Sequence, residues 1–183
     1  LQTRGDLGEA KLSETISGPI LNYLADHKPR SISEILEELK GTGIDLSMIL
    51  QTVMVLIGKR SMGLAQEKEE ILKAKDKTDR INKYLIKHAH GSKKIGYLVS
   101  PVTGGGIPCS RIEKLFIAAK QKGMNKPSDL AAFVWEIISS QNESLLKNGK
   151  KINNPKDSID FLTTEAKDFD KKQLPVLKAL FIL

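Results

Sequence analysis

The chain has 183 residues, of which 40% are hydrophobic and 28% charged, a composition typical of an ordinary globular protein of one or two domains. A single cysteine excludes an internal disulfide framework, and no apolar run approaches the ~20 residues that a membrane-spanning helix needs. Without a signal-peptide pattern, the chain is expected to be cytoplasmic. Because it begins with Leu1 and not methionine, we expect a processed product or a piece of a longer polypeptide.

The formal charge of +7 is unevenly distributed. Residues 1–66 carry 7 basic and 8 acidic side chains, residues 67–94 carry 9 and 5, and residues 95–183 carry 13 and 9. The densest basic run consists of Lys73, Lys75, Lys77, Arg80, Lys83, Lys87, Lys93 and Lys94. Such a run attracts nucleic acid or an acidic partner, but a solvated helix face is the favoured interpretation.

Residues 1–72 are predicted to form a winged-helix-like unit, because three short amphipathic helices are followed by a wing-like strand. The helices are expected at residues 16–28, 33–40 and 45–58. Residues 61–70 are expected to supply the strand and then a charged connector to the second part of the chain.

The third of these helices bears on nucleic-acid binding, because the corresponding helix of a winged-helix protein reads base edges. Base reading needs Arg, Lys, Asn or Gln side chains on the exposed face. This helix offers only Ser47, Gln51 and Thr52 before its last turn, and it is apolar enough to be packed on most sides. We therefore interpret the unit as a scaffold or a docking surface.

Residues 73–183 are predicted to form a helical unit with a few short strands, which makes the fold class mainly α. Helices are expected over residues 76–91, from Ser110 to Gly123, from Ser128 onward, and from about Ser158 towards Leu180. The last helix is expected to break before Pro175, and residues 93–101 are strand-like.

The segment 100–110, SPVTGGGIPCS, is a candidate ligand-binding loop. A phosphate-binding loop converges backbone N–H groups on one point and usually adds a lysine followed by Ser or Thr. This segment has no lysine in register, and Pro108 lacks an N–H. A tight turn that lets a strand and a helix pack closely is therefore predicted.

No catalytic, cofactor-binding or metal-ligating residue is assigned to this chain. Cys109 lies near a helix start, where the helix dipole lowers a thiol pKa, but the sequence ties no histidine to it. A small buried residue is the favoured interpretation of Cys109. His88 and His90 are two residues apart on a helix, so they point in different directions and cannot share a metal.

Four stretches of the chain carry a family resemblance: YLVSPVTGGGIPCSRIEKLFIAA, PSDLAAFVWEII, LLKNGK and LPVLKALFIL. They resemble the C-terminal part of methyltransferase regulatory-domain proteins, which include bacterial protein-lysine methyltransferases that modify outer-membrane proteins. The resemblance runs from about Asp6 to Leu183 and is strongest at residues 100–101, 104–108 and 132–135. In that family an S-adenosylmethionine-binding domain comes first, and its glycine-rich segment is missing here.

The resemblance implies a non-catalytic accessory region that regulates a protein-lysine methyltransferase or presents its protein substrate. S-adenosylmethionine would be held by the catalytic domain and not by this chain. The implied partners are that catalytic domain and the protein substrate; self-association into a homo-oligomer is left open, and no membrane partner is expected.

If a protein substrate docks here, the candidate residues are Phe116, Phe133 and Trp135 with the loop 103–108, although burial in the core is favoured for each aromatic ring. The alternative function is a winged-helix nucleic-acid-binding protein that uses the basic run, with nucleic acid the less favoured partner. A third hypothesis is a free-standing enzyme that uses Cys109.

Overall fold

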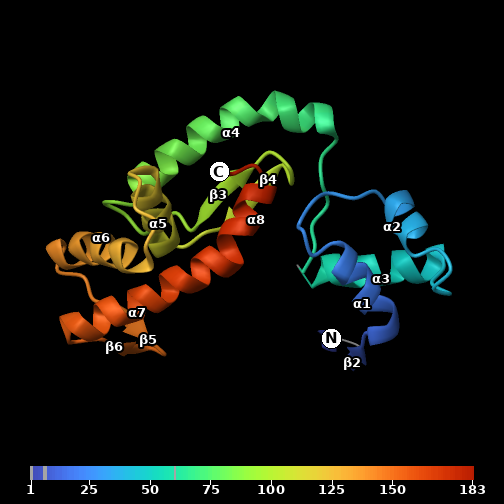
Figure 1. Ribbon diagram of the computed structural model, residues 1–183, viewed down its shortest axis with the longest axis horizontal. Helices are drawn as coiled ribbons and strands as arrows, with labels where there is room; N and C mark the ends of the chain where they lie inside the picture. The colour runs from blue at the N-terminus through green and yellow to red at the C-terminus, as the bar shows by residue number, and fades with distance from the viewer. Residues whose placement is uncertain (1, 6–7, 60) are drawn as a thin grey trace. The chain divides into compact units, whose positions relative to one another are not determined.

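The computed structural model describes residues 2–5, 8–59 and 61–183, with side chains from residue 12 onward (Figure 1). The fold is mainly helical with a few short strands, which confirms the predicted class. The chain forms two compact units, Leu1–Gln66 and Glu67–Leu183. This division lies earlier than the expected one after residue 72, because the polar segment interpreted as a connector begins the long helix α4 (Lys68–His88).

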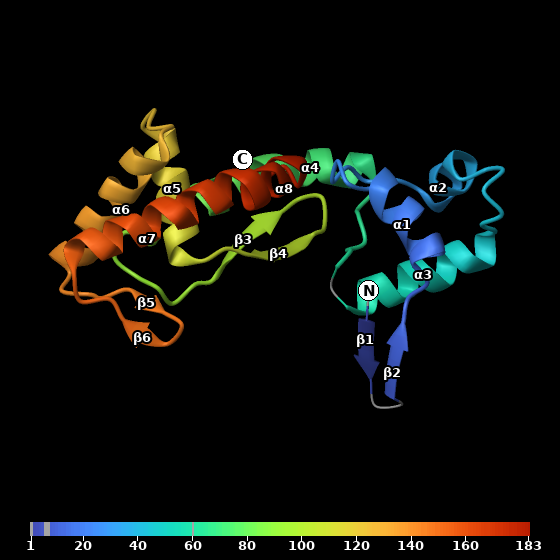
Figure 2. The ribbon, with the colours of Figure 1, turned by 60° about the horizontal axis from the view of Figure 1, so that its bottom comes forward.

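The first unit consists of a β-hairpin followed by three helices. Its elements are β1 (Gln2–Gly5), β2 (Gly8–Lys11), α1 (Glu14–Tyr23), α2 (Ile32–Glu38) and α3 (Leu46–Gly58). Strands β1 and β2 pair antiparallel ahead of α1 (Figure 2). Residues 61–67 contain no strand, so the prediction of a wing within 61–70 is wrong. The charged residues from Lys68 onward extend α4 instead.

The three helices of the first unit enclose a small apolar core. Its buried members are Ile20, Ile35, Leu39, Ile49 and Val53. Helix α3 begins where the sequence predicted, because the side chain of Asp45 accepts a hydrogen bond from the Met48 N–H at 2.9 Å.

The second unit, Glu67–Leu183, holds the larger core of the chain. After α4 its elements are β3 (Tyr97–Ser100), β4 (Gly105–Pro108), α5 (Arg111–Gln121), α6 (Pro127–Ser140), β5 (Leu146–Lys147), β6 (Lys150–Lys151), α7 (Pro155–Asp168), η1 (Phe169–Gln173) and α8 (Leu174–Ala179). Helices α5 and α6 pack together, and α6 packs on α7 (Figure 1). Leu115, Phe116, Leu130, Val134 and Leu162 lie fully buried between them.

Local signals at the ends of α5 are confirmed. Ser110 caps the helix, and Glu113 completes a capping box by accepting a hydrogen bond from the Ser110 N–H. Gly123 follows the helix with φ of +88°, a left-handed conformation that glycine adopts without strain.

The predicted break before Pro175 takes the form of a π-helical segment. The chain stays helical through α7, η1 and α8, and η1 lies directly before the first turn of α8 that contains Pro175. Proline lacks the N–H that an α-helix needs at that position, and a wider turn accommodates the missing bond. Phe169 in this segment turns into the core, 5.7 Å from the ring of Phe116.

Candidate functional site

The glycine-rich segment forms the turn and second strand of a β-hairpin. Strand β4 pairs antiparallel with β3, with Leu98 opposite Ile107 and Ser100 opposite Gly105. Gly104 has φ of +65°, so the turn uses the backbone conformation that glycine permits. The segment therefore forms a tight turn between two strands and not, as predicted, between a strand and a helix. Strand β4 then leads into α5.

Ser100 ties this hairpin turn to the end of α8. Its fully buried hydroxyl donates to the Leu180 carbonyl at 2.9 Å and accepts from the N–H groups of Val102 and Thr103 at 3.1 and 3.3 Å. A buried hydroxyl with one donated and two accepted hydrogen bonds has no capacity left for a ligand. Ser100 therefore has a structural role.

Lys114 is a buried cation that the sequence analysis missed. Its side chain is 1% exposed, and Nζ donates to the carbonyls of Ile95 and Cys109. Burial lowers the pKa of Lys114, with Cys109 and Glu113 opposing that effect. One sequence signal could have predicted that Lys114 is buried: it lies four residues before Ala118, so both are on the inner side of α5.

Cys109 is a buried, inert thiol. The residue is 1% exposed, which confirms the favoured interpretation. Burial first and the carboxylate of Glu113 second raise the pKa of Cys109 to about 12, against a weaker opposing effect of Lys114. Only the thiolate is a strong nucleophile, so this position does not support the hypothesis of a Cys109 enzyme.

The three aromatic candidates for substrate docking do not form one surface. Phe116 is 0% exposed in the core, so it cannot contact a partner of the folded chain. Phe133 and Trp135 are partly buried on α6, and residues two apart on a helix point to different sides. The ring of Phe133 contacts His90, at 5.9 Å between centroids, and Lys122, whose Nζ lies 4.6 Å from the ring.

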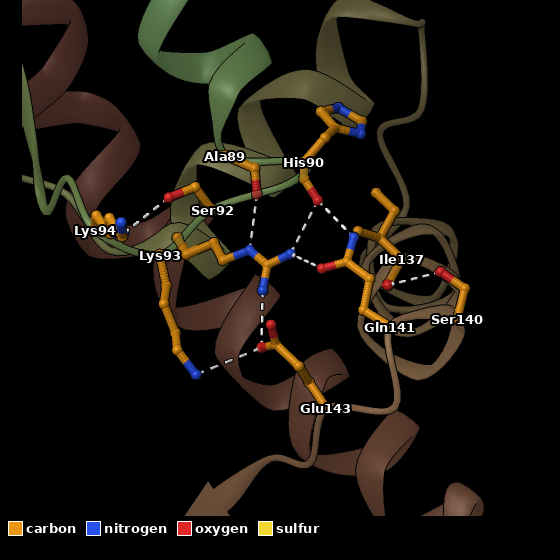
Figure 3. Close-up of polar contacts among 10 residues, drawn as sticks. Ala89, His90, Ser92, Lys93, Lys94, Ile137, Ser140, Gln141 and Glu143 are labelled. Carbon is orange, nitrogen blue, oxygen red and sulfur yellow. Dashed lines mark hydrogen bonds and ion pairs between the residues drawn. The ribbon is translucent and has the colours of Figure 1, made fainter.

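Arg111 is the centre of a polar cluster in the second unit, and Figure 3 labels its partners Ala89, His90, Gln141 and Glu143. Its guanidinium donates to the carbonyls of Ala89 and His90 at 2.7 and 2.9 Å. It also donates to the side chains of Gln141 and Glu143 at 2.6 and 2.8 Å. The Arg111 side chain is 9% exposed, and these bonds join the end of α4 to the segment after α6. The cluster is satisfied internally and holds the fold together.

The two neighbouring histidines have different environments. Burial lowers the pKa of His90, and the cations Lys122 and Arg111 lower it further. The exposed ring of His88 stacks on that of Tyr84, one helical turn earlier. In the described part of the chain, no group of three or more His, Cys, Asp or Glu side chains is placed to hold a metal.

Helix α3 exposes an apolar surface that the sequence analysis did not expect. Its buried face consists of Ile49, Thr52, Val53 and Leu56. Leu46, Leu50 and Met54 are 45%, 42% and 71% exposed. We call these three residues the α3 stripe, because side chains at intervals of four lie on one side of a helix. Within the first unit only one face of this helix is covered, and not most of its sides as expected.

The chain is similar to the uncharacterized protein sll1526 of Synechocystis sp., with 30% identity over 183 residues. The match covers 100% of this chain and 35% of the relative, so the chain spans about a third of the length of the relative. No family model and no solved structure matches. Within the described residues, none of the helices combines the length and apolar character needed to cross a membrane.

Proposed function

We propose that this chain is a non-catalytic accessory region of a cytoplasmic, S-adenosylmethionine-dependent protein-lysine methyltransferase. In this proposal the α3 stripe binds the catalytic domain and helps to present the protein substrate. The stretches around residues 97–119, 127–138, 145–150 and 174–183 support it through their resemblance to methyltransferase regulatory-domain proteins.

The single observation that carries a docking role is the exposure of the α3 stripe. Leu46, Leu50 and Met54 line one side of a well-capped helix whose other face is fixed in the core. Covering their exposed fractions would contribute on the order of 3 kcal/mol, since full burial of one such side chain contributes about 1.5–3 kcal/mol. Contiguous exposed apolar side chains are typical of interaction surfaces.

The interior polar groups of the second unit support an accessory role rather than catalysis. Ser100, Lys114 and Arg111 use their donors on backbone carbonyls and structural side chains. A nucleophile needs a base within hydrogen-bonding reach, and the candidate thiol of Cys109 is held protonated in the core.

The length of the relative is compatible with a catalytic domain elsewhere. About two thirds of the Synechocystis protein lies outside the match, which is room for a cofactor-binding domain. The alternative of a winged-helix protein that reads bases with α3 has less support, because no strand lies within residues 61–67 and the exposed flank of α3 is apolar.

The test uses the complete polypeptide that carries this region. The double variant Leu50→Glu, Met54→Glu is compared with Gln51→Glu, which adds a charge at an exposed position on the same helix. Lysine methylation of protein substrates is measured with labelled S-adenosylmethionine, cofactor binding by calorimetry, and folding by thermal unfolding.

We expect the double variant to lose lysine methylation at least about tenfold, as loss of 1.4 kcal/mol or more of docking energy implies. Its cofactor binding and unfolding temperature should stay close to those of the unmodified protein, and Gln51→Glu should behave normally. A complete polypeptide that binds no S-adenosylmethionine would refute the methyltransferase assignment. Normal methylation by the double variant would refute the docking role of the stripe.

A further inference from the structure

The outward side of α4 presents a basic surface with an aromatic centre. We call it the α4 face, and it consists of Lys73, Lys77, Arg80, Lys83, Tyr84, Lys87 and His88, all exposed. The opposite side of the helix is fixed by the buried residues Ile71, Thr78, Asn82 and Ile86. The α4 face is therefore held outward on a rigid element.

Most of the positive charge on the α4 face has no ion-pair partner in the part of the chain that the structure describes. Lys73 pairs with Glu70 at 2.6 Å, whereas no ion pair of Lys77, Lys83 or Lys87 occurs among the described residues. Within the described ranges, the one hydrogen bond of Arg80 goes to a backbone carbonyl, that of Asp76 at 3.4 Å.

These four cations lie three or four residues apart along the helix. Like charges at that spacing destabilise a helix by about 0.2–0.5 kcal/mol per pair. Asp76 and Asp79, one turn before Arg80 and Lys83, offset part of this repulsion, and an anionic partner would neutralise the remaining positive charge.

An exposed aromatic pair lies in the middle of these cations. The ring of Tyr84 is parallel to that of His88, with 5.7 Å between centroids and 13° between planes. Tyr84 is 62% exposed, and Ile81 beside it is 46% exposed. Lys77 and Arg80 precede this pair by one to two turns, and Lys87 follows Tyr84 by one turn.

We propose that the α4 face binds single-stranded nucleic acid, with phosphates on Lys77, Arg80, Lys83 and Lys87 and a base stacked on Tyr84. Cationic side chains that follow a backbone beside an aromatic platform are the recurring means of binding single strands. A duplex hides its base faces, so the stack favours a single strand over double-stranded nucleic acid. Anionic lipids have no flat ring for Tyr84 to stack on, and an acidic peptide supplies one only through an aromatic side chain.

This inference does not depend on α3 or on the methyltransferase proposal. The small number of base-reading side chains on α3 disfavoured nucleic acid in the sequence analysis. A surface that recognises phosphates and base faces needs no base-edge contacts, so that objection does not apply to α4.

The test titrates the 183-residue chain into a fluorescently labelled uridine oligonucleotide and follows its fluorescence anisotropy. The oligonucleotide has about 16 nucleotides, the upper end of the site size of one single-strand-binding fold. Binding should weaken as salt is added. For four phosphate contacts, a plot of the logarithm of the association constant against the logarithm of the salt concentration should have a slope of about −3. The variant Tyr84→Ala should weaken binding about tenfold with the slope unchanged. The variant Lys83→Gln, Lys87→Gln should make the slope shallower by about 1.4.

Matched controls lie elsewhere in the second unit. Tyr97→Ala removes another exposed tyrosine, and Lys147→Gln, Lys150→Gln removes the same charge from the β5–β6 hairpin; both should bind normally. The proposal is overturned by lack of binding at low salt, by a normal affinity of Tyr84→Ala, or by equal losses in the controls. Equal competition by phosphatidylglycerol vesicles or polyglutamate, at matched charge, would also overturn it.

Discussion

The side chain of Asn82 hydrogen-bonds both backbone groups of Val99: its amide donates to the carbonyl at 2.8 Å, and its oxygen accepts from the N–H at 2.7 Å. Asn82 thereby occupies the place of a further strand along the outer edge of β3. A two-stranded hairpin has unpaired edges that need partners when they are buried. Asn82 of helix α4 is the partner of the β3 edge at Val99. The two hydrogen bonds also fix α4 in place, and α4 presents the α4 face.

Replacing Asn82 by leucine should lower the free energy of unfolding by about 2–4 kcal/mol, because the two part-buried hydrogen bonds to the backbone of Val99 are lost and the asparagine site is itself buried. Chemical denaturation followed by circular dichroism measures this change. Asn125→Leu, at an exposed asparagine, should change it by less than about 0.5 kcal/mol. Equal effects of the two substitutions would show that the contact with Val99 does not stabilise the fold.

Native Cys109 should react with a thiol reagent such as dithionitrobenzoate about 1,000-fold more slowly at pH 8 than in the unfolded chain. A pKa of about 12 leaves roughly that much less thiolate than the ordinary cysteine pKa of about 8.5–9. The absorbance of the released thiolate, followed with and without denaturant, gives both rates. Rapid reaction of the folded chain would mean that Cys109 is accessible and ionised.

Arg111→Lys should destabilise the second unit by about 2–3 kcal/mol although it keeps the charge. A lysine cannot reproduce the fork that bonds Ala89, His90, Gln141 and Glu143 together. The matched control is Arg80→Lys, at an exposed arginine, where thermal unfolding should be nearly unchanged. A tolerated Arg111→Lys would show that the cluster contributes only charge.

The stability of the second unit should fall as the pH drops below about 6.5, the ordinary histidine pKa. Burial and the cations Lys122 and Arg111 hold the pKa of His90 below that value, so the unfolded chain takes up the proton first. The loss should be complete once the pH is below the pKa of the folded state.

Denaturation curves between pH 7 and pH 5 measure this dependence. His90→Asn should reduce the slope of stability against pH, whereas His88→Asn, at an exposed site on α4, should leave it as in the unmodified chain. The same slope in all three proteins would rule out His90 as the source.

The sequence alone determined the local features of this protein. Ser110, Asp45 and Gly123 act at the helix ends where their side chains and backbone preferences place them, since capping depends on neighbours within four residues. The mainly helical class follows from the apolar periodicity. The second helix was expected from residue 33, but α2 begins at Ile32 with Ser31 as its cap, because Ser31 accepts the Glu34 N–H and Glu34 completes the capping box.

Only the tertiary structure decided which helix faces are covered. Lys114 is polar and yet buried because two backbone carbonyls from the hairpin segment meet its ammonium group, and those partners lie 19 and 5 residues away. The α3 stripe is apolar and yet exposed because the first unit brings helices to only one side of α3. The pairing of Tyr84 with His88 follows from helix geometry, but its exposure depends on α4 being packed through the opposite side. Burial is a property of the whole fold, since it depends on distant segments that periodicity within one helix does not contain.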